Sequence, residues 1–191
     1  MAQNRLLSVL VENRMGVLQR VASMIRRRGF NIESLSVGPT EDPSMSRMTI
    51  EVHIGVQQAE QAAKQLDKLI DVITVDDITG LDRVAHELLL AKITAPRETR
   101  EEVQAIVELF KGKIVDVGIG TLMAEVTGES EQIDRFLTLV APLGIKEIAR
   151  SGVVALAKGD EARISIGEVS AYEERAKSLG NGFMQDTTGD I

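Results

Sequence analysis

The chain has 191 residues, with 29 acidic and 22 basic side chains and a formal net charge of −7. Hydrophobic residues make up 43% of it and charged residues 27%, which is ordinary for a folded globular protein and excludes wholesale disorder. The absence of cysteine excludes disulfides, thiolate metal sites and thiol catalysis, and the acidic balance argues against phosphate binding as the main role.

The first half of the chain carries hydrophobic patterns that predict one β-α-β-β-α-β unit. The expected elements are a strand at 5–11, a helix at 17–28, strands at 30–37 and 47–54, a helix at 59–70 and a strand at 72–78. The arginines at 26–28 suit the negative end of the first helix, and Gly29 fits the left-handed position after it. The apolar residues of the next strand change parity near Glu33 and Ser34, which predicts a bulge there.

The second half repeats the pattern, with glycines between the elements. The expected elements are a strand at 87–94, a helix at 97–110, strands at 113–117 and 121–127, a helix at 131–140 and a strand at 145–157. We therefore expect an α+β fold of two tandem ferredoxin-like βαββαβ domains, at 4–79 and 87–159, with a linker at 80–86. The apolar periodicity weakens over 160–191, where we expect a tail that is partly helical, around 169–179, or disordered.

The residue types that carry catalysis or bind metals do not form a convincing set. His53 and His86 are far apart in the sequence and have no metal-ligand spacing, which favours surface or interface roles. Asp76 and Asp77 are neighbours in a strand, so their side chains point to opposite faces and would not chelate one ion together. The glycines at 118–120 join two expected strands, whereas a phosphate-cradling loop leads into a helix. We expect no catalytic and no metal site.

The turn before the first helix has residue types that suit a receptor for a small zwitterion. Amide groups in the first turn of a helix lack backbone partners and carry a partial positive charge, so they can bind a carboxylate. Gly16 lets a ligand approach the backbone, and Asn13 and Asn31 offer neutral polar groups. Val17 and Ile32 offer apolar surface for the ligand's side chain. From spacing alone an alternative stays open, in which Asn13 caps the helix and Gly16 only relieves turn strain.

Longer motifs add a resemblance to a known family. The stretch from Leu7 to Val52, including "RRGFNIESL" and "GPTEDPSMSRMTI", resembles the N-terminal ACT domain of acetolactate synthase (acetohydroxyacid synthase) small regulatory subunits. The stretch "LLLAKITAPRETREEVQAIVELFKGKIVDV" resembles the C-terminal domain of the same family. The resemblance covers about residues 5–159, which is most of the chain.

The resemblance implies a regulatory subunit that is not itself an enzyme. Such subunits bind a large catalytic subunit, which uses thiamine diphosphate, a divalent metal such as Mg and FAD to condense two 2-oxo acids in branched-chain amino acid biosynthesis. They raise its activity and confer feedback inhibition by a branched-chain amino acid, here expected to be valine. Their ACT domains pair side by side into a homodimer, with the effector bound at the dimer interface. No cofactor is then expected in this chain.

The same resemblance assigns the effector-binding residues. The positions carried over from the family are Asn13, Met15, Gly16, Val17, Leu18, Asn31 and Ile32. Asn13 and Gly16 match the start of the helix, and the backbone amides of Val17 and Leu18 would face the ligand carboxylate. Asn31 and Ile32 match positions supplied by the partner protomer. Met15 departs from the family, which often has proline or a small residue there, and a bulky, flexible thioether would narrow the pocket or alter its selectivity.

Two other functions use the same fold. A stand-alone amino-acid sensor or transcriptional regulator would need a DNA-binding segment, and neither a helix-turn-helix pattern nor a basic charge balance is found. A small hydrolase of the acylphosphatase type would need an anion-cradling loop, which has no matching signature. The arginines at 26–28 either dock the large subunit or form a solvated helix end. No apolar run is long enough to cross a bilayer, so we expect a cytoplasmic protein that binds neither membranes nor nucleic acid.

Overall fold

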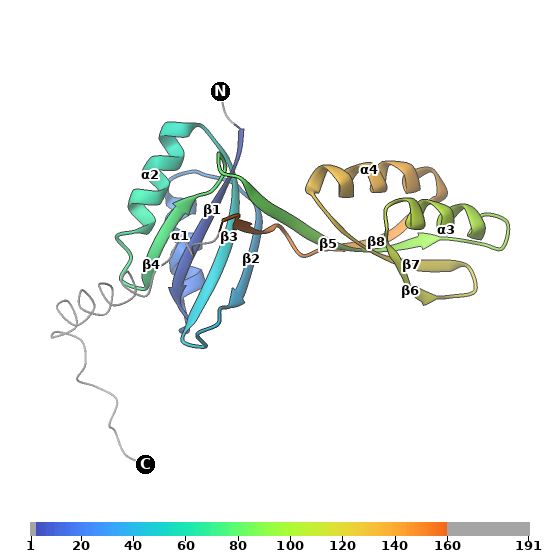
Figure 1. The fold of residues 1–191 in the computed structure, drawn as a ribbon, viewed down its shortest axis with the longest axis horizontal. Coiled ribbons are helices and arrows are strands. Elements are labelled where there is room, and N and C mark those ends of the chain that lie inside the picture. The colour runs from blue at the N-terminus through green and yellow to red at the C-terminus, as the bar shows by residue number, and fades with distance from the viewer. Residues whose placement is uncertain (1–2, 160–191) are drawn as a thin grey trace, which may run out of the picture.

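A computed structural model describes residues 3–159 of the chain (Figure 1). The expected tail at 160–191, with its short helix, lies outside the described residues. The first domain contains β1 (Gln3–Glu12), α1 (Val17–Arg27), β2 (Ile32–Pro39), β3 (Met45–Ile54), α2 (Val56–Leu66) and β4 (Val72–Asp77). The second contains β5 (Arg83–Thr94), α3 (Arg100–Leu109), β6 (Lys113–Val117), β7 (Thr121–Gly128), α4 (Ser130–Val140), a 3-10 turn (Ala141–Leu143), β8 (Ile145–Arg150) and β9 (Val154–Ala157).

The first sheet has the strand order β2-β3-β1-β4, with α1 and α2 packed on one of its faces (Figure 1). Successive side chains of a strand point to opposite faces of the sheet. The side chains on the face under α1 and α2 are apolar and buried, which explains why the helices pack there. The buried strand residues are Leu7, Val9, Val11, Met48, Ile50, Val52, Ile54 and Val72. Strands β2 and β4 form the two edges, since each pairs with a single neighbour among the described residues.

Two local predictions for the first domain are confirmed. Gly29 follows α1 with a φ of +75°, the left-handed conformation in which only glycine is unstrained, so it ends the helix as expected. The pairing of β2 with β3 shifts register between Ile32 and Ser34, so the bulge expected near Glu33 is present.

The second sheet has the strand order β6-β7-β5-β8, and α3 and α4 cover its buried face. Phe136 of α4 is completely buried, and its ring meets that of Phe110 edge to face with the centroids 5.5 Å apart. Both halves therefore have the ferredoxin-like arrangement and a core of their own, which confirms the α+β prediction. Among residues 3–159, no helix is long and apolar enough to span a membrane.

The connection between the domains differs from the prediction. The chain at 83–86 was expected in the linker, but it forms the start of β5, which pairs residue by residue with β9. The strand expected over 145–157 is also split, because the chain bends at Ser151–Val153, with Gly152 at a φ of +74°. A local pattern cannot reveal this pairing, because β9 lies some seventy residues after the start of β5.

The ribbon formed by β9 and the start of β5 covers part of the helix-free face of the first sheet. Ala85 and Ala155 face inward from the ribbon, and Val153 joins them from the preceding bend. They pack against Leu6 and Ile78 of the first domain in a small apolar cluster of its own. The two domains are thus joined by packed side chains and not only by the chain connection.

A buried ion pair fixes β5 to β8 at the end of the second domain that faces the first. Glu87 lies on β5 with its side chain only 3% exposed, and the Arg150 side chain on β8 is 34% exposed. The Arg150 guanidinium donates to both carboxylate oxygens of Glu87, through Nε at 2.9 Å and through a second nitrogen, and to Asp134 at 2.9 Å. Burial alone would raise the pKa of Glu87, but hydrogen bonds from Arg150 and Ser130 and the charge of Arg150 hold it below its ordinary value of 4.5.

We predict that Arg150→Gln lowers the free energy of unfolding by about 3 kcal/mol near neutral pH, because it leaves the buried Glu87 carboxylate without its cation. A group with a lowered folded pKa contributes its full stability above its ordinary value, here 4.5, and loses that contribution as the pH falls through the folded pKa. The difference between wild type and variant should therefore shrink in acid. Denaturant titrations at several pH values measure it.

Lys92→Gln provides the matched control, since it removes a cation from an exposed pair on the same two strands, Lys92 to Glu147 at 3.5 Å. It should cost less than about 1 kcal/mol at any pH. Equal effects of the two substitutions would contradict the role given to the buried pair.

Candidate functional site

The turn between β1 and α1 leaves the start of the helix open to solvent. Gly16 is the N-cap residue, in the left-handed conformation with a φ of +83°, and no side chain among the described residues caps the helix. The first turn contains no acidic side chain either. The amides there retain the positive partial charge of a helix start, which a bound anion would neutralise.

Asn13 holds this turn against the connection between β2 and β3. Its side-chain Nδ2 donates to the carbonyl of Pro43 at 3.0 Å, and its backbone amide donates to the carbonyl of Ser44 at 2.7 Å. The alternative in which Asn13 caps α1 is therefore wrong. Asn13 instead fixes the shape of the turn, and its exposed side chain lies beside the open helix start.

The three apolar residues of the turn have different surroundings. Val17 is 2% exposed and belongs to the first core, so its side chain cannot line a binding site as the sequence suggested, and only its backbone can contact a ligand. Leu18 is 44% exposed on the first turn of α1. Met15 is 92% exposed, so within one chain it does not narrow a pocket.

Asn31 and Ile32 lie at the opposite end of the same sheet. Ile32 pairs with Val52, which pairs with Arg5, whereas the last residue of β2, Pro39, pairs with Ser46, which pairs with Val11. Arg5 and Val11 are six residues apart on β1, which corresponds to about 20 Å. One chain therefore does not bring the two halves of the candidate site together.

The first residues of β2 are ordered by local contacts. The side chain of Asn31 is exposed, and its Nδ2 donates to Glu33 Oε1 at 2.7 Å across the bulge. Ile32 is half-buried against the first core, which leaves part of its side chain on the outer edge of the sheet. Both residues are thus displayed beside the outer edge of β2, which has no partner strand in the described part of the chain.

Two cavities lie apart from the helix start at Gly16, and the second of them borders Glu33 and Ser34 at the start of β2. One of about 610 Å³ lies beside β9 on the helix-free face of the first sheet and is lined in part by Ser8, Ser36 and Arg47. Another of about 450 Å³ lies between the domains and is lined in part by Glu51, Arg150 and residues of the bend at Ser151–Val153. Sequence reasoning missed this contact between domains, although the Ser-Gly pair inside an apolar run was a turn signal.

Comparisons with known proteins agree with this architecture. Residues 7–74 match the family model described as the AHAS small subunit-like ACT domain, and residues 86–159 match the model for the small subunit of acetolactate synthase. The acetolactate synthase small subunit of Mycolicibacterium smegmatis is 48% identical over 80% of this chain and 90% of its own length. That of Bacillus subtilis is 43% identical over 84% of this chain and 94% of its own length.

A solved structure gives the same result. The crystal structure of the acetolactate synthase small subunit from Thermotoga maritima matches with a TM-score of 0.78 and 38% identity, covering 83% of this chain and 99% of that one. The fold and its first domain thus define a regulatory protein of the ACT-domain class. The chain belongs to the acetolactate synthase small-subunit family, a family of regulatory subunits that associate with a large catalytic subunit.

We predict that Gly16→Ala lowers the free energy of unfolding by about 1 kcal/mol, because a φ of +83° strains the alanine backbone. Gly38→Ala is the matched control, since an added Cβ meets open space at both positions and only Gly16 has a positive φ. The control should be close to neutral. Chemical denaturation compares them, and equal losses would show that backbone conformation is not what requires glycine at the turn.

Proposed function

We propose that this chain activates the large catalytic subunit of acetolactate synthase in the cytoplasm and makes it sensitive to feedback by a branched-chain amino acid, with valine as the first candidate. The chain itself contributes no catalytic group to this scheme. Thiamine diphosphate, Mg and FAD belong to the catalytic partner. The observation that carries the proposal is the uncapped start of α1 behind Gly16, in a chain whose two halves both match the small-subunit family.

The open helix start suits the carboxylate of an amino acid. The Val17 amide donates to the Arg14 carbonyl at a long 3.4 Å, and the amides that follow it in the first turn can donate to the carboxylate. The positive end of the helix attracts the charge of the carboxylate. Gly16 has no side chain, and a Cβ built there would meet nothing within 4 Å, so a ligand has room to approach the backbone. Asn13 is already held by its bonds to Pro43 and Ser44, so binding does not have to order the turn.

A second copy of the chain would complete the site. Within residues 3–159, β2 pairs only with β3 and its outer edge has no partner strand. An exposed strand edge is stabilised by pairing with another strand. If two β2 strands pair antiparallel about a two-fold axis near Leu35 and Ser36, the start of one β2 lies beside the end of the other. Asn31 and Ile32 of the partner then lie close to the turn at Asn13 and Gly16. Within one chain the same residues are separated from that turn by about six residues of strand, or about 20 Å.

Feedback then requires the amino acid to bind one arrangement of the dimer more tightly than another. A coupling of about 1–3 kcal/mol is typical of such regulation. The polar atoms of the site would recognise the ammonium and carboxylate groups that all amino acids share. Selection for a branched side chain would come from the apolar surface of Leu18, Met15 and the partner's Ile32.

We predict that Gly16→Asp abolishes feedback while activation of the large subunit is retained, because the new carboxylate repels that of the ligand and fills its space. The measurement is acetolactate formation by the reconstituted holoenzyme, with and without valine, leucine and isoleucine. Gly16→Asn is the matched control, since asparagine has nearly the same shape, tolerates a positive φ and carries no charge. It should weaken feedback less than aspartate does. A fully valine-sensitive Gly16→Asp holoenzyme would contradict the site.

We predict that mixing two defective chains restores effector binding. Gly16→Asp and Asn31→Ala each damage every site of their own homodimer. If each site takes its turn from one chain and Asn31 from the other, a mixed dimer contains one undamaged site, so random assortment restores about a quarter of all sites. Calorimetry with valine before and after exchange of subunits measures the recovery. No recovery would mean that each site is formed within one chain.

A further inference from the structure

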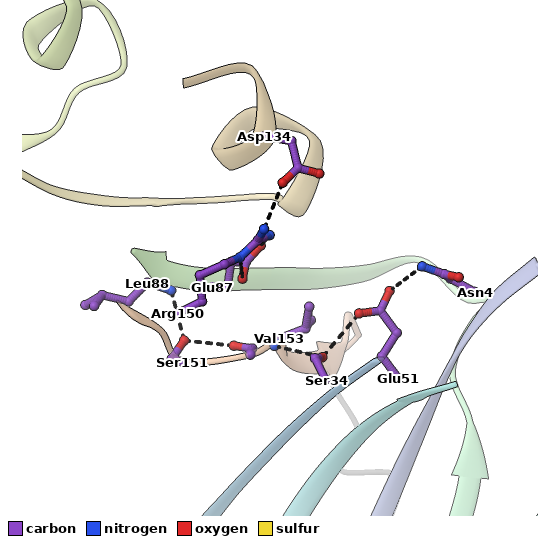
Figure 2. Close-up of polar contacts among 10 residues, drawn as sticks. Asn4, Ser34, Glu51, Glu87, Leu88, Asp134, Arg150, Ser151 and Val153 are labelled. Atoms are coloured by element: carbon purple, nitrogen blue, oxygen red, sulfur yellow. Dashed lines mark hydrogen bonds and ion pairs between the residues drawn. The ribbon is translucent and has the colours of Figure 1, made fainter. Parts of the chain in front are cut away.

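The bend between β8 and β9 is held by two serines of β2. The backbone amide of Val153 donates to Ser34 Oγ at 3.4 Å, and Ser36 Oγ donates to the backbone carbonyl of Val153 at 2.7 Å. Both polar groups of this one buried residue of the bend are therefore satisfied by side chains of a single strand, and Figure 2 shows the bond between Val153 and Ser34. A movement of β2 relative to the bend would break at least one of these bonds.

The backbone of the bend also lies directly on β2. Gly152 has a φ of +74°, and a Cβ built there would approach the backbone of Leu35 to 3.3 Å. Such a contact is tighter than side chains ordinarily make, so glycine allows the two backbones to come this close. We call Ser34, Leu35, Ser36, Gly152 and Val153 the bend junction.

The bend junction is tied to both domains by further hydrogen bonds. Ser34 Oγ donates to Glu51 on β3, and the other carboxylate oxygen of Glu51 accepts from Asn4 on β1. On the other side, the amide of Leu88 on β5 donates to Ser151 Oγ, and Arg150 next to it binds Glu87 (Figure 2). A shift at the bend junction is thus passed to strands of each sheet.

The strand that holds the bend begins at the proposed effector contacts. Asn31 precedes β2 and donates to Glu33, the residue displaced by the bulge, and Ser34 follows immediately. A ligand that engages the Asn31 amide competes with the Asn31–Glu33 hydrogen bond and so acts on the bulge. Because the bulge is the irregular point of the pairing between β2 and β3, it is where β2 can change its twist with the least loss of ladder hydrogen bonds.

We propose that the bend junction is the connection through which an effector bound at the start of β2 changes the placement of the second domain. Ser36 and Gly152 are then positioning residues for regulation and not ligand contacts. This inference rests on the proposed function, because it needs an effector at Asn31 and Ile32. The inference adds that a substitution in the bend junction, outside the effector site, can weaken inhibition of the holoenzyme without weakening effector binding.

Ser36→Ala tests this separation, since it removes the donor to Val153 and changes no residue of the proposed effector site. The reconstituted holoenzyme should keep its activation by the small subunit and its affinity for valine within about 3-fold, while the factor by which saturating valine lowers the rate falls about 10-fold, as expected for loss of a typical coupling. Gly152→Ala, which pushes the bend away from Leu35, should act in the same direction.

Thr138→Val is the matched control. It also removes one hydroxyl that donates to one backbone carbonyl, that of Asp134 at 2.8 Å, but on an exposed face of α4, one helical turn beyond the Asp134 carboxylate that binds Arg150. It should leave affinity, activation and maximal inhibition unchanged. A structural defect common to any such substitution would lower all three readings in both variants.

Hydrogen exchange provides a second measurement, the change in amide exchange on adding valine at individual residues, which a general loss of stability would not alter at one site alone. In the wild-type chain, valine should change the exchange of the Val153 amide as well as that of residues near Gly16 and Asn31, and Ser36→Ala should abolish only the change at Val153. Unaltered maximal inhibition in Ser36→Ala, or valine protection that stops before the bend in the wild type, overturns the inference while leaving the proposed function intact. Absence of any effector binding to the wild type overturns both.

Discussion

The structure depends on one long strand, β5, which packs on the first sheet at its start and forms part of the second sheet along the rest of its length. β5 pairs with β9 through Arg83–His86 and then with β7 and β8 through the rest of its length. In the first part of β5, small side chains such as Ala85 pack against Leu6 and Ile78 of the first domain. The second domain is built on the remaining part. The position of the second domain is therefore set by how β5 and β9 sit on the helix-free face of the first.

In this arrangement the two faces of the first sheet contact different parts of the molecule. The helix-covered face supplies the core that fixes α1, and with it the open helix start behind Gly16. The opposite face receives the ribbon and the bend at Ser151–Val153. β2 takes part in both, because its side chains alternate between the faces and none of the strands described for residues 3–159 pairs with its outer edge. One edge strand thus connects the proposed binding site, the proposed partner chain and the second domain.

Local patterns in the sequence were sufficient for most elements and for the fold. The alternation over Met48–Ile54 placed β3 correctly, and Gly29 ended α1 where a left-handed residue was required. The pairing of β5 with β9 could not be read, because it joins segments that are far apart and whose polar ends, such as Arg83 and His86, look like a linker. For the candidate site, the sequence indicated the residues but not that Asn31 lies at the far end of the sheet from Gly16. That distance follows only from strand register.

The shared strand also affects how this chain can be divided in the laboratory. A fragment that ends at the apparent boundary near residue 79 would keep its own helix-covered core, but would expose Leu6 and Ile78 to water. The complementary fragment would start β5 without the surface on which Ala85 and Ala155 rest. Neither piece would present the surface it has in the whole molecule. A first-domain fragment intended for binding or screening work should instead carry residues 83–86 and the returning strand β9, joined by a short designed turn.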